Sequence, residues 1–336
     1  MKCLVFGLGK AGMAALGYLH ARGAEVVGVY SRFSHVGADV GTLSGGTETG
    51  LKVQTVSDFV PHRGMADIAL FFTTSDMADL LGEPRTCLEH GINVVTIAEQ
   101  ALFPWIFAPD ICAELDGIAR ANDCTLTATG VNDTVMCALP AIIAGIAPDV
   151  RHIDIEATGN FGVLGPATLQ ALPLGLTPTE YDASQAEAGP VDPAASICGQ
   201  VALALAAMTG LIPERIEVAE VPLFAGAAIE VPTIGRTIGA GLTRGLIESV
   251  RVQTRQGPTI EIRLHGKLFE AGEEEYLSVR IDGLCPLAMD LRPLPSIETT
   301  AAIAVGRAPD VIAASPGFIT IDQLPAALLR DRRAYV

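Results

Sequence analysis

The stretch Lys2-Cys3-Leu4-Val5-Phe6-Gly7-Leu8-Gly9-Lys10-Ala11-Gly12 decides the fold of this chain. Residues 2–6 have the pattern of a buried strand, and a helical apolar pattern follows from residue 13 to 20. In this context Gly7 allows a tight turn, Gly9 lets the backbone approach a pyrophosphate, and Gly12 lets the helix pack closely on the strand. The free N–H groups at the start of the helix would face the phosphates. We therefore expect a dinucleotide-binding loop formed by Gly7, Leu8, Gly9, Lys10, Ala11 and Gly12.

The end of the second predicted strand, residues 24–30, bears on the choice of cofactor. A site for NAD usually has Asp or Glu about 20 residues past the glycines, where it binds the ribose hydroxyls. Here Ser31 and Arg32 occupy that place, and the next carboxylate is Asp39. A hydroxyl and a guanidinium suit a 2′-phosphate, because Arg offers a planar fork of charged donors. The sequence favours NADP as cofactor, and use of NAD as well stays open.

Composition limits the classes of function. The 336 residues give room for two domains, and 49% of them are hydrophobic. A net charge of −16 argues against nucleic acid and anionic membranes as partners. Seven scattered cysteines and six histidines show no metal-ligand spacing, so we expect reduced thiols and no metal site. With no signal peptide pattern, and with residues 195–213 interpreted as a buried or interface helix rather than a membrane span, we expect a soluble cytoplasmic protein.

Strands and helices alternate in the first part of the chain, as in an α/β fold with a doubly wound parallel sheet. Further strands are predicted at 51–54, 66–72, 92–96 and 124–128, with helices at 77–90 and 111–122. Alternating segments then predict a second α+β domain built on an open mixed sheet, with strands at 151–157, 215–221, 246–254, 259–264 and 275–281 and an apolar helix at 194–208. We expect a first domain at 1–130, a second at 131–298, and a tail at 299–336, with a helix at 299–306 and a closing segment at 319–330, that returns to the first.

Ligands of doubly wound sheets bind beyond the carboxyl ends of the strands. The hydroxyls of Thr73, Thr74 and Ser75 follow the fourth strand, where a cofactor ribose or nicotinamide could lie. Glu99 is the only carboxylate just past the fifth strand, and the apolar run 101–105 follows it. A carboxylate in such surroundings could exchange a proton near neutral pH; a helix-capping or solvated glutamate is the alternative interpretation. Because Glu99 is followed by Gln100 and not by lysine, a simple sugar or polyol dehydrogenase is disfavoured.

Four stretches together resemble the 2,4-diaminopentanoate dehydrogenases and the related native amine dehydrogenases. They are Thr96–Trp105, Thr129–Asn132, Phe161–Pro166 with Gly175–Pro178, and Thr300–Val305 with Ser315–Gly317. The resemblance implies a Rossmann domain, a second domain like that of dihydrodipicolinate reductase, and pairing as homodimers. It also implies NAD(P)-dependent oxidative deamination of a primary amine or diamino acid, or reductive amination of a ketone with ammonia. The family's catalytic carboxylate matches Glu99, which would bind ammonium and transfer its proton.

The chain departs from this family at two places. The family usually has two glutamates where this chain has Glu99-Gln100, and Asn-Pro-Gly-Phe where it has Asn132-Asp133-Thr134-Val135, which adds the charge of Asp133 near the expected nicotinamide. Candidate substrate-binding residues are Asn132, which could also bind the cofactor amide, and Asn160, Thr168 and His265 in the second domain. Two alternatives remain open: an NADPH-dependent imine or carbonyl reductase related to dihydrodipicolinate reductase, and a non-catalytic dinucleotide sensor.

Overall fold

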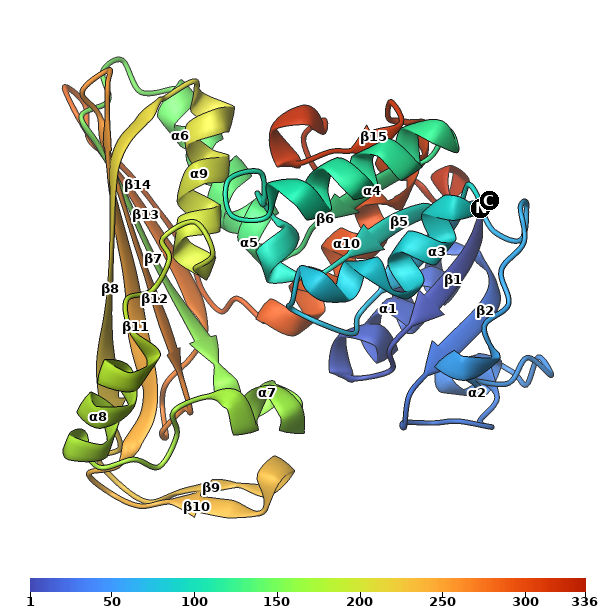
Figure 1. Ribbon diagram of the computed structural model, residues 1–336, viewed down its shortest axis with the longest axis horizontal. Helices are drawn as coiled ribbons and strands as arrows, with labels where there is room; N and C mark the ends of the chain where they lie inside the picture. The colour runs from blue at the N-terminus through green and yellow to red at the C-terminus, as the bar shows by residue number, and fades with distance from the viewer. The chain divides into compact units, whose positions relative to one another are not determined.

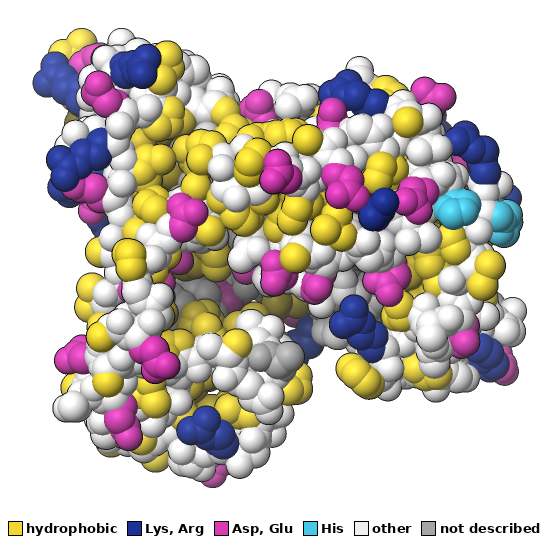
Figure 2. All heavy atoms as spheres, in the orientation of Figure 1, with side chains coloured by type: hydrophobic (Ala, Val, Ile, Leu, Met, Phe, Trp, Pro, Cys, Tyr) yellow, Lys and Arg dark blue, Asp and Glu magenta, His cyan; other side chains and the backbone are white. Residues whose placement is uncertain are grey.

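The chain divides into two compact units, residues 1–138 with 297–336, and residues 139–296. The structure, a computed structural model, describes the backbone of residues 1–336 and every side chain except that of Ala167. The first unit extends past the predicted border at residue 130, because the turn after the sixth strand continues into helical turns that stay with the first sheet. Charged side chains of both signs are scattered over the face of the molecule in Figure 2.

The first unit is built on a seven-stranded parallel sheet with the order β15-β6-β5-β4-β1-β2-β3. This is the predicted doubly wound arrangement, since the chain moves outward in both directions from β1 (Figure 1). The strands are β1 (Lys2–Phe6), β2 (Glu25–Ser31), β3 (Gln54–Thr55), β4 (Ile68–Phe71), β5 (Asn93–Thr96), β6 (Thr125–Ala128) and β15 (Gly317–Phe318). The helices are α1 (Lys10–Arg22), α2 (Val40–Leu43), α3 (Glu83–Glu89), α4 (Pro109–Ala121), α5 (Val131–Asp133) and α10 (Ser296–Ala313).

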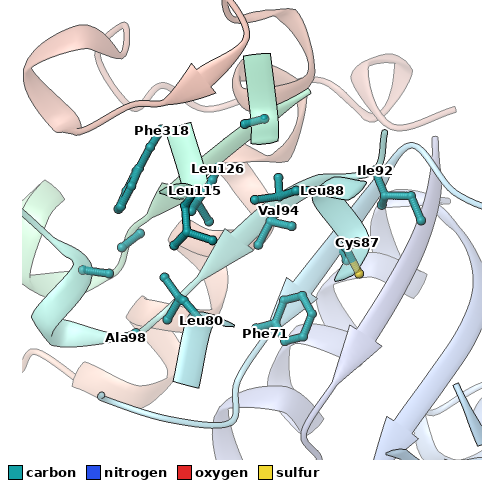
Figure 3. Close-up of a cluster of buried hydrophobic side chains, with 14 of the residues drawn as sticks. Phe71, Leu80, Cys87, Leu88, Ile92, Val94, Ala98, Leu115, Leu126 and Phe318 are labelled. Atoms are coloured by element: carbon teal, nitrogen blue, oxygen red, sulfur yellow. The ribbon is translucent and has the colours of Figure 1, made fainter. Parts of the chain in front are cut away.

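Apolar side chains cover both faces of this sheet, as its nearly uninterrupted hydrophobic strands predict. On one face α3 and α4 pack against β4, β5 and β6, and Figure 3 shows Leu88 and Leu115 beside Val94 and Leu126. On the other face α1 and α10 pack against β1 and β4. The tail of the chain contributes α10 to this unit, and also β15, which pairs with β6.

Three predicted elements of the first unit are wrong in extent. The third strand is predicted at 51–54, but the observed strand is Gln54–Thr55, and Lys52 makes only an isolated bridge to Asp39. The helix predicted at 77–90 is a 3-10 turn, Ala78–Leu81, followed by α3. Gly82 separates the two with non-helical backbone angles, and the proline after it favours a new helix start. The helix predicted at 299–306 is the much longer α10, which contains Pro309.

The second unit is an open mixed sheet with the order β14-β13-β7-β12-β11-β8, in which β7 and β12 are parallel and the other neighbours antiparallel. Its strands are β7 (His152–Asn160), β8 (Pro213–Phe224), β11 (Thr243–Thr254), β12 (Thr259–Lys267), β13 (Tyr276–Asp282) and β14 (Leu287–Leu291), and β9 (Ile229–Val231) pairs with β10 (Arg236–Ile238) outside it. The helices are α6 (Leu139–Gly145), α7 (Pro166–Ala171), α8 (Pro178–Ala188) and α9 (Ile197–Thr209).

The predicted apolar helix of the second unit is α9, which packs on β8, β11 and β12. Its N-terminus is held by Glu248 of β11, whose carboxylate accepts a hydrogen bond from the Cys198 N–H at 2.6 Å. Burial raises the pKa of Glu248. The short β9–β10 pair, β14, α7 and α8 were not predicted, because none of them has a long apolar repeat.

Candidate functional site

The carboxyl ends of four neighbouring strands carry the predicted cofactor and catalytic residues of the first unit. β1 lies between β2 and β4, and β5 lies between β4 and β6. Gly7 follows β1, Thr73 follows β4, Glu99 follows β5 and Gly130 follows β6. Since the strands are parallel, these residues lie along one edge of the sheet.

Gly7 and Gly12 occupy positions that exclude a side chain. Gly7 has a φ of +87°, and a Cβ atom there would lie 2.6 Å from the carbonyl oxygen of Phe72. A Cβ atom on Gly12 would lie 1.9 Å from the carbonyl oxygen of Gly7. At Gly9, by contrast, no described atom lies within 4 Å of the corresponding position. Turn and packing geometry therefore require glycine at 7 and 12, and the backbone at Gly9 is open to a ligand.

The N-terminus of α1 fits an anionic group. Its first N–H groups, those of Lys10, Ala11 and Gly12, have no partner within the helix. Gly9 supplies no capping side chain, and no acidic residue stands in the first turn. The positive end of the helix dipole therefore faces the open side of the loop without a competing carboxylate. These features fit a pyrophosphate.

The end of β2 is connected to the glycine loop by a residue that the sequence analysis missed. The Ser31 hydroxyl is buried and lies 3.0 Å from the Ser34 hydroxyl, and the Ser34 N–H donates to it at 3.2 Å. The Ser34 hydroxyl in turn donates to the carbonyl oxygen of Leu8 at 3.2 Å. Arg32 is exposed. Ser31 and Ser34 thus shape the turn that presents Arg32.

Asp39 is bound within its own loop. Its carboxylate accepts hydrogen bonds from the N–H groups of Thr42 at 3.1 Å, Thr49 at 3.1 Å and Gly50 at 2.8 Å. Desolvation opposes its ionisation, but these hydrogen bonds and nearby Lys52 lower its pKa below the ordinary value. Because both oxygens are used in this way, Asp39 is not placed to replace the acidic residue that binds ribose in NAD sites.

Gln100 fastens the loop after β4 to the segment after β5. Its N–H donates to the Ser75 carbonyl oxygen at 3.1 Å, and its side-chain oxygen accepts from the Met77 N–H at 3.0 Å. Within the loop, the Thr74 hydroxyl accepts from the Asp76 N–H at 2.9 Å. The residue that replaces the family's second glutamate therefore has a structural partner, and it places the Thr73–Ser75 hydroxyls beside the Glu99 segment.

Glu99 is the first residue of a 3-10 turn, Glu99–Ala101, that follows β5. It is half-buried, between the fully buried Ala98 and Ala101. The apolar run after it packs into the core, where Trp105 lies 5.3 Å from Phe318 between ring centroids. Figure 3 shows Ala98 in the same cluster as Phe318. The backbone that carries Glu99 is thus anchored by core packing at the carboxyl edge of the sheet.

Asp133 does not add a charge to the surface of the site. It is fully buried, and it accepts hydrogen bonds from the Thr129 hydroxyl at 2.7 Å, the Gly130 N–H at 2.8 Å and the Thr134 hydroxyl at 3.2 Å. Desolvation raises its pKa, although these bonds and nearby Arg307 oppose the rise. The departure from the family's Pro-Gly turn is therefore a buried cap of α5.

Asn132 lies half-buried in α5, next to Val131, whose N–H donates to the Thr300 hydroxyl of α10 at 3.1 Å. The Asn132 carbonyl oxygen accepts from the Cys137 thiol at 3.3 Å. The predicted site segment at 129–132 is therefore held by the returning tail of the chain.

In the second unit, Asn160 ends β7 and Thr168 is exposed on α7. The Asn160 side-chain oxygen accepts from the Gly162 N–H at 2.9 Å. His265, on the neighbouring β12, pairs in register with Thr158. Because side chains alternate, His265 and Asn160 point to the same face, opposite the one that carries the buried Ile262.

His265 faces a carboxylate. Its Nε2 lies 3.7 Å from Glu156, which accepts a hydrogen bond from the Tyr276 hydroxyl at 2.5 Å. Desolvation lowers the pKa of His265, and the charges of Lys267 and Arg263 lower it further, although Glu156 works in the opposite direction. The neutral imidazole is therefore favoured at neutral pH.

Lys267 forms an ion pair with Glu273. It lies 2.6 Å from Glu273, which also binds Arg244 through two hydrogen bonds of 2.6 and 3.1 Å. Among the side chains that the structure describes, no group of three His, Cys, Asp or Glu residues is arranged to hold a metal ion. No helix in the described chain is both long and apolar enough to cross a membrane.

Comparison with known proteins adds to this geometry. A solved amine dehydrogenase from Mycobacterium smegmatis is 32% identical, covers 98% of this chain and 97% of its own, and superimposes with a TM-score of 0.87. The 2,4-diaminopentanoate dehydrogenase of Acetoanaerobium sticklandii is 27% identical over 189 residues, which are 54% of this chain and 53% of that protein. The chain thus matches about half the length of this curated relative.

More distant structures share the fold alone. A scyllo-inositol dehydrogenase from Lactobacillus casei, solved with bound NAD(H), is 12% identical, covers 91% of this chain and 88% of its own, and has a TM-score of 0.54. No family model matches the chain.

Proposed function

The chain belongs to the amine dehydrogenase family, and from that premise we propose that it catalyses NAD(P)-dependent interconversion of a primary amine or diamino acid and the corresponding ketone with ammonia. One observation carries the proposal. Glu99 stands at the end of β5 on the edge of the sheet where the glycine loop follows β1. A proton-transfer group and a dinucleotide loop thus share one edge, as a dehydrogenase requires.

The residues at this edge fit a nicotinamide dinucleotide. The N-terminus of α1, with Leu8, Gly9 and Lys10, would hold the pyrophosphate, and the Thr73–Ser75 hydroxyls would contact the ribose or nicotinamide. We propose NADP as the preferred form, because Asp39 is bound within its loop and Arg32 is exposed beside the end of β2. When bound, the dinucleotide supplies or accepts the hydride.

Glu99 would perform the acid–base steps. In the direction of amination its carboxylate binds ammonium and takes one proton, so that neutral ammonia attacks the carbonyl carbon. The proton is returned when the hydroxyl leaves as water, and the carboxylate stabilises the resulting positive iminium ion. The iminium carbon then accepts the hydride and becomes the amine carbon. Core packing around Ala98 and Ala101 fixes the backbone that carries Glu99.

Asn132, Asn160, Thr168 and His265 remain proposed contacts for the substrate. Asn132 follows β6 at the same edge as Glu99 and can offer its amide to the substrate or to the cofactor. In the second unit, Asn160 and His265 share one face of the sheet, and His265 would act there as a neutral hydrogen-bonding group. The homodimer implied by the resemblance is likewise a proposal, which light scattering of the purified protein would test.

The test is oxidation of NADPH by the purified protein with a panel of short ketones and keto acids, in the presence and absence of ammonium. We expect turnover that depends on ammonium and yields the amine. Equal turnover without ammonium would replace the proposal by a carbonyl reductase, and ammonium-independent reduction of a cyclic imine would indicate an imine reductase. NADPH binding with no turnover on any compound would indicate a sensor.

A further inference from the structure

One carboxylate of the second unit holds several separated backbone positions. This residue is Glu275, which precedes β13. Its Oε1 atom accepts a hydrogen bond from the Asn160 N–H at 2.8 Å, and its Oε2 atom accepts one from the Ser296 N–H at 2.8 Å. The Ser296 hydroxyl donates to Oε1 at 2.8 Å, and the Leu294 N–H donates to the Glu275 carbonyl oxygen at 2.9 Å. Both carboxylate oxygens are therefore used in fixing main chain.

One of these positions, Ser296, is the start of α10. Ser296 is the first residue of this helix, and the N–H groups of a first helical turn have no partner within the helix. A carboxylate is the favoured partner there, because it also interacts with the positive end of the helix dipole. Glu275 thus caps α10 from a segment that lies 21 residues earlier in the chain.

The second position is a proposed substrate contact. Glu275 holds the N–H of Asn160, and the Asn160 side-chain oxygen is held by the Gly162 N–H at 2.9 Å. These two bonds fix both the backbone and the χ angles of Asn160. Its side-chain NH₂ group forms no hydrogen bond with any residue that the structure describes, so that group remains for a ligand.

The same helix holds a second proposed contact one turn later. The hydroxyl of Thr300 in α10 accepts a hydrogen bond from the N–H of Val131, the residue before Asn132. The Ser296 contact lies within the second unit, and the Thr300 contact lies within the first.

We infer that Glu275 is a positioning residue of the reaction, because its carboxylate fixes the backbone of Asn160, a proposed substrate contact, and joins it to Ser296, the first residue of α10. The inference rests on the proposed function. If Glu275 were only a stabilising cap, its replacement would not lower turnover selectively. We predict instead that turnover falls by more than cofactor affinity changes.

The experiment compares Glu275→Gln with Glu274→Gln. Glu274 is the adjacent glutamate and is the matched control. It is exposed, and its carboxylate makes only a long ion pair of 3.9 Å with Arg292. A glutamine at 275 keeps one acceptor oxygen and turns an NH₂ group toward the other N–H, so one of the two backbone bonds must be lost. We expect amide exchange at Asn160 or Ser296 to accelerate at least tenfold, and kcat for ammonium-dependent ketone reduction to fall about tenfold or more. The dissociation constant for NADPH should change less than twofold, and Glu274→Gln should behave as wild type.

Glu275→Asp serves as a second variant if Glu275→Gln does not fold. It keeps the charge but is too short to reach both N–H groups, so an intermediate kcat is expected. Faster exchange with an unchanged kcat would overturn the inference and leave Glu275 as a cap only, and unchanged exchange would overturn the connection itself. A wild-type protein without amination activity would overturn the proposed function instead, and the exchange rates would still decide whether Glu275 joins Asn160 to α10.

Discussion

The Thr300 hydroxyl accepts a hydrogen bond from the Val131 N–H at 3.1 Å, across 169 residues of sequence. The Thr300 methyl group also limits the space at Gly130, where a Cβ atom would lie 2.9 Å from it. Two of the stretches that carry the family resemblance, 129–132 and 300–305, therefore meet at this contact. Their joint presence has a physical reason: one stretch forms the turn after β6, and the other covers it.

Replacement of Thr300 by valine should destabilise the first unit by about 1–2 kcal/mol, because the isosteric side chain leaves the Val131 N–H without its acceptor. Urea unfolding followed by circular dichroism would measure the change. Thr299→Val is the matched control, since Thr299 is the neighbouring half-buried threonine of the same helix, and it should cost less than about 0.5 kcal/mol.

Gly130→Ala should be destabilising with Thr300 present and better tolerated with Thr300→Ser. Serine keeps the hydroxyl that serves Val131 but lacks the methyl group that a Cβ at residue 130 would meet. A double-mutant cycle should therefore show a favourable coupling of about 0.5–1 kcal/mol. Additive effects would show that the backbone of this turn moves to relieve the contact.

Glu99→Gln should reduce kcat of ammonium-dependent amination by about 10²–10⁴-fold, because the amide cannot take the proton from ammonium. The dissociation constant for NADPH should stay within twofold, since the pyrophosphate is proposed to lie at α1. Gln100→Glu is the control: its carboxylate can still accept from the Met77 N–H, so kcat should stay within about threefold of wild type. Activity of Glu99→Gln near that of wild type would remove Glu99 from the mechanism.

Local pattern predicted the strand order of the first unit, but not the extent of all its elements. The strand, glycine loop and helix over residues 2–20, and the parallel order around β1, follow from hydrophobic runs and from glycines that the backbone geometry requires. The helix predicted over 77–90 failed because its apolar period continues across Gly82, where the chain leaves helical angles. Pro84, in the first turn of α3, was the signal that could have marked the new start.

The sequence indicates candidate site residues only where the type of residue itself suggests a chemical role. Glu99 and Arg32 stand out by charge at a strand end, whereas Ser34, Gln100 and Glu275 act through hydrogen bonds to backbone groups. Glu275 reaches an N–H that lies 115 residues away in sequence, and nothing in its own neighbours indicates that partner. The sequence predicts that Asp133 adds a charge near the nicotinamide, and only the three-dimensional fold shows that its carboxylate is buried and bound to the Gly130 N–H.

Arg32→Asp should raise the KM for NADPH at least tenfold and lower the KM for NADH, because a carboxylate repels a 2′-phosphate and accepts hydrogen bonds from a free ribose. Arg255→Asp is the control, since Arg255 is an exposed arginine in a turn of the second unit and its replacement makes the same change in net charge. A ratio of the two KM values that does not change in Arg32→Asp would refute the preference for NADP.

Glu273 makes the free energy of unfolding of the second unit depend on pH. Desolvation opposes its ionisation, but hydrogen bonds from Arg244 and Lys267 lower the pKa of Glu273 to about 2. A lowered pKa means that the folded state gives up this proton more readily than the unfolded state. The resulting stabilisation is complete above the unfolded value near 4.5 and is lost as the pH falls toward 2. From the size of the shift it amounts to about 3 kcal/mol at neutral pH.

The charge of Glu273 should therefore contribute about 3 kcal/mol of the free energy of unfolding that Glu273→Gln loses at pH 7. This pH-dependent part of the difference from wild type should shrink by more than half between pH 6 and pH 3. A part of the loss that does not depend on pH is also expected, because the mutation leaves the buried Arg244 with the Leu268 carbonyl oxygen as its neutral acceptor. Urea unfolding of both proteins at several pH values provides the measurement, with Glu274→Gln as the exposed control. A difference that stays constant over this pH range would show that Glu273 acts through packing and neutral hydrogen bonds, and not through its charge.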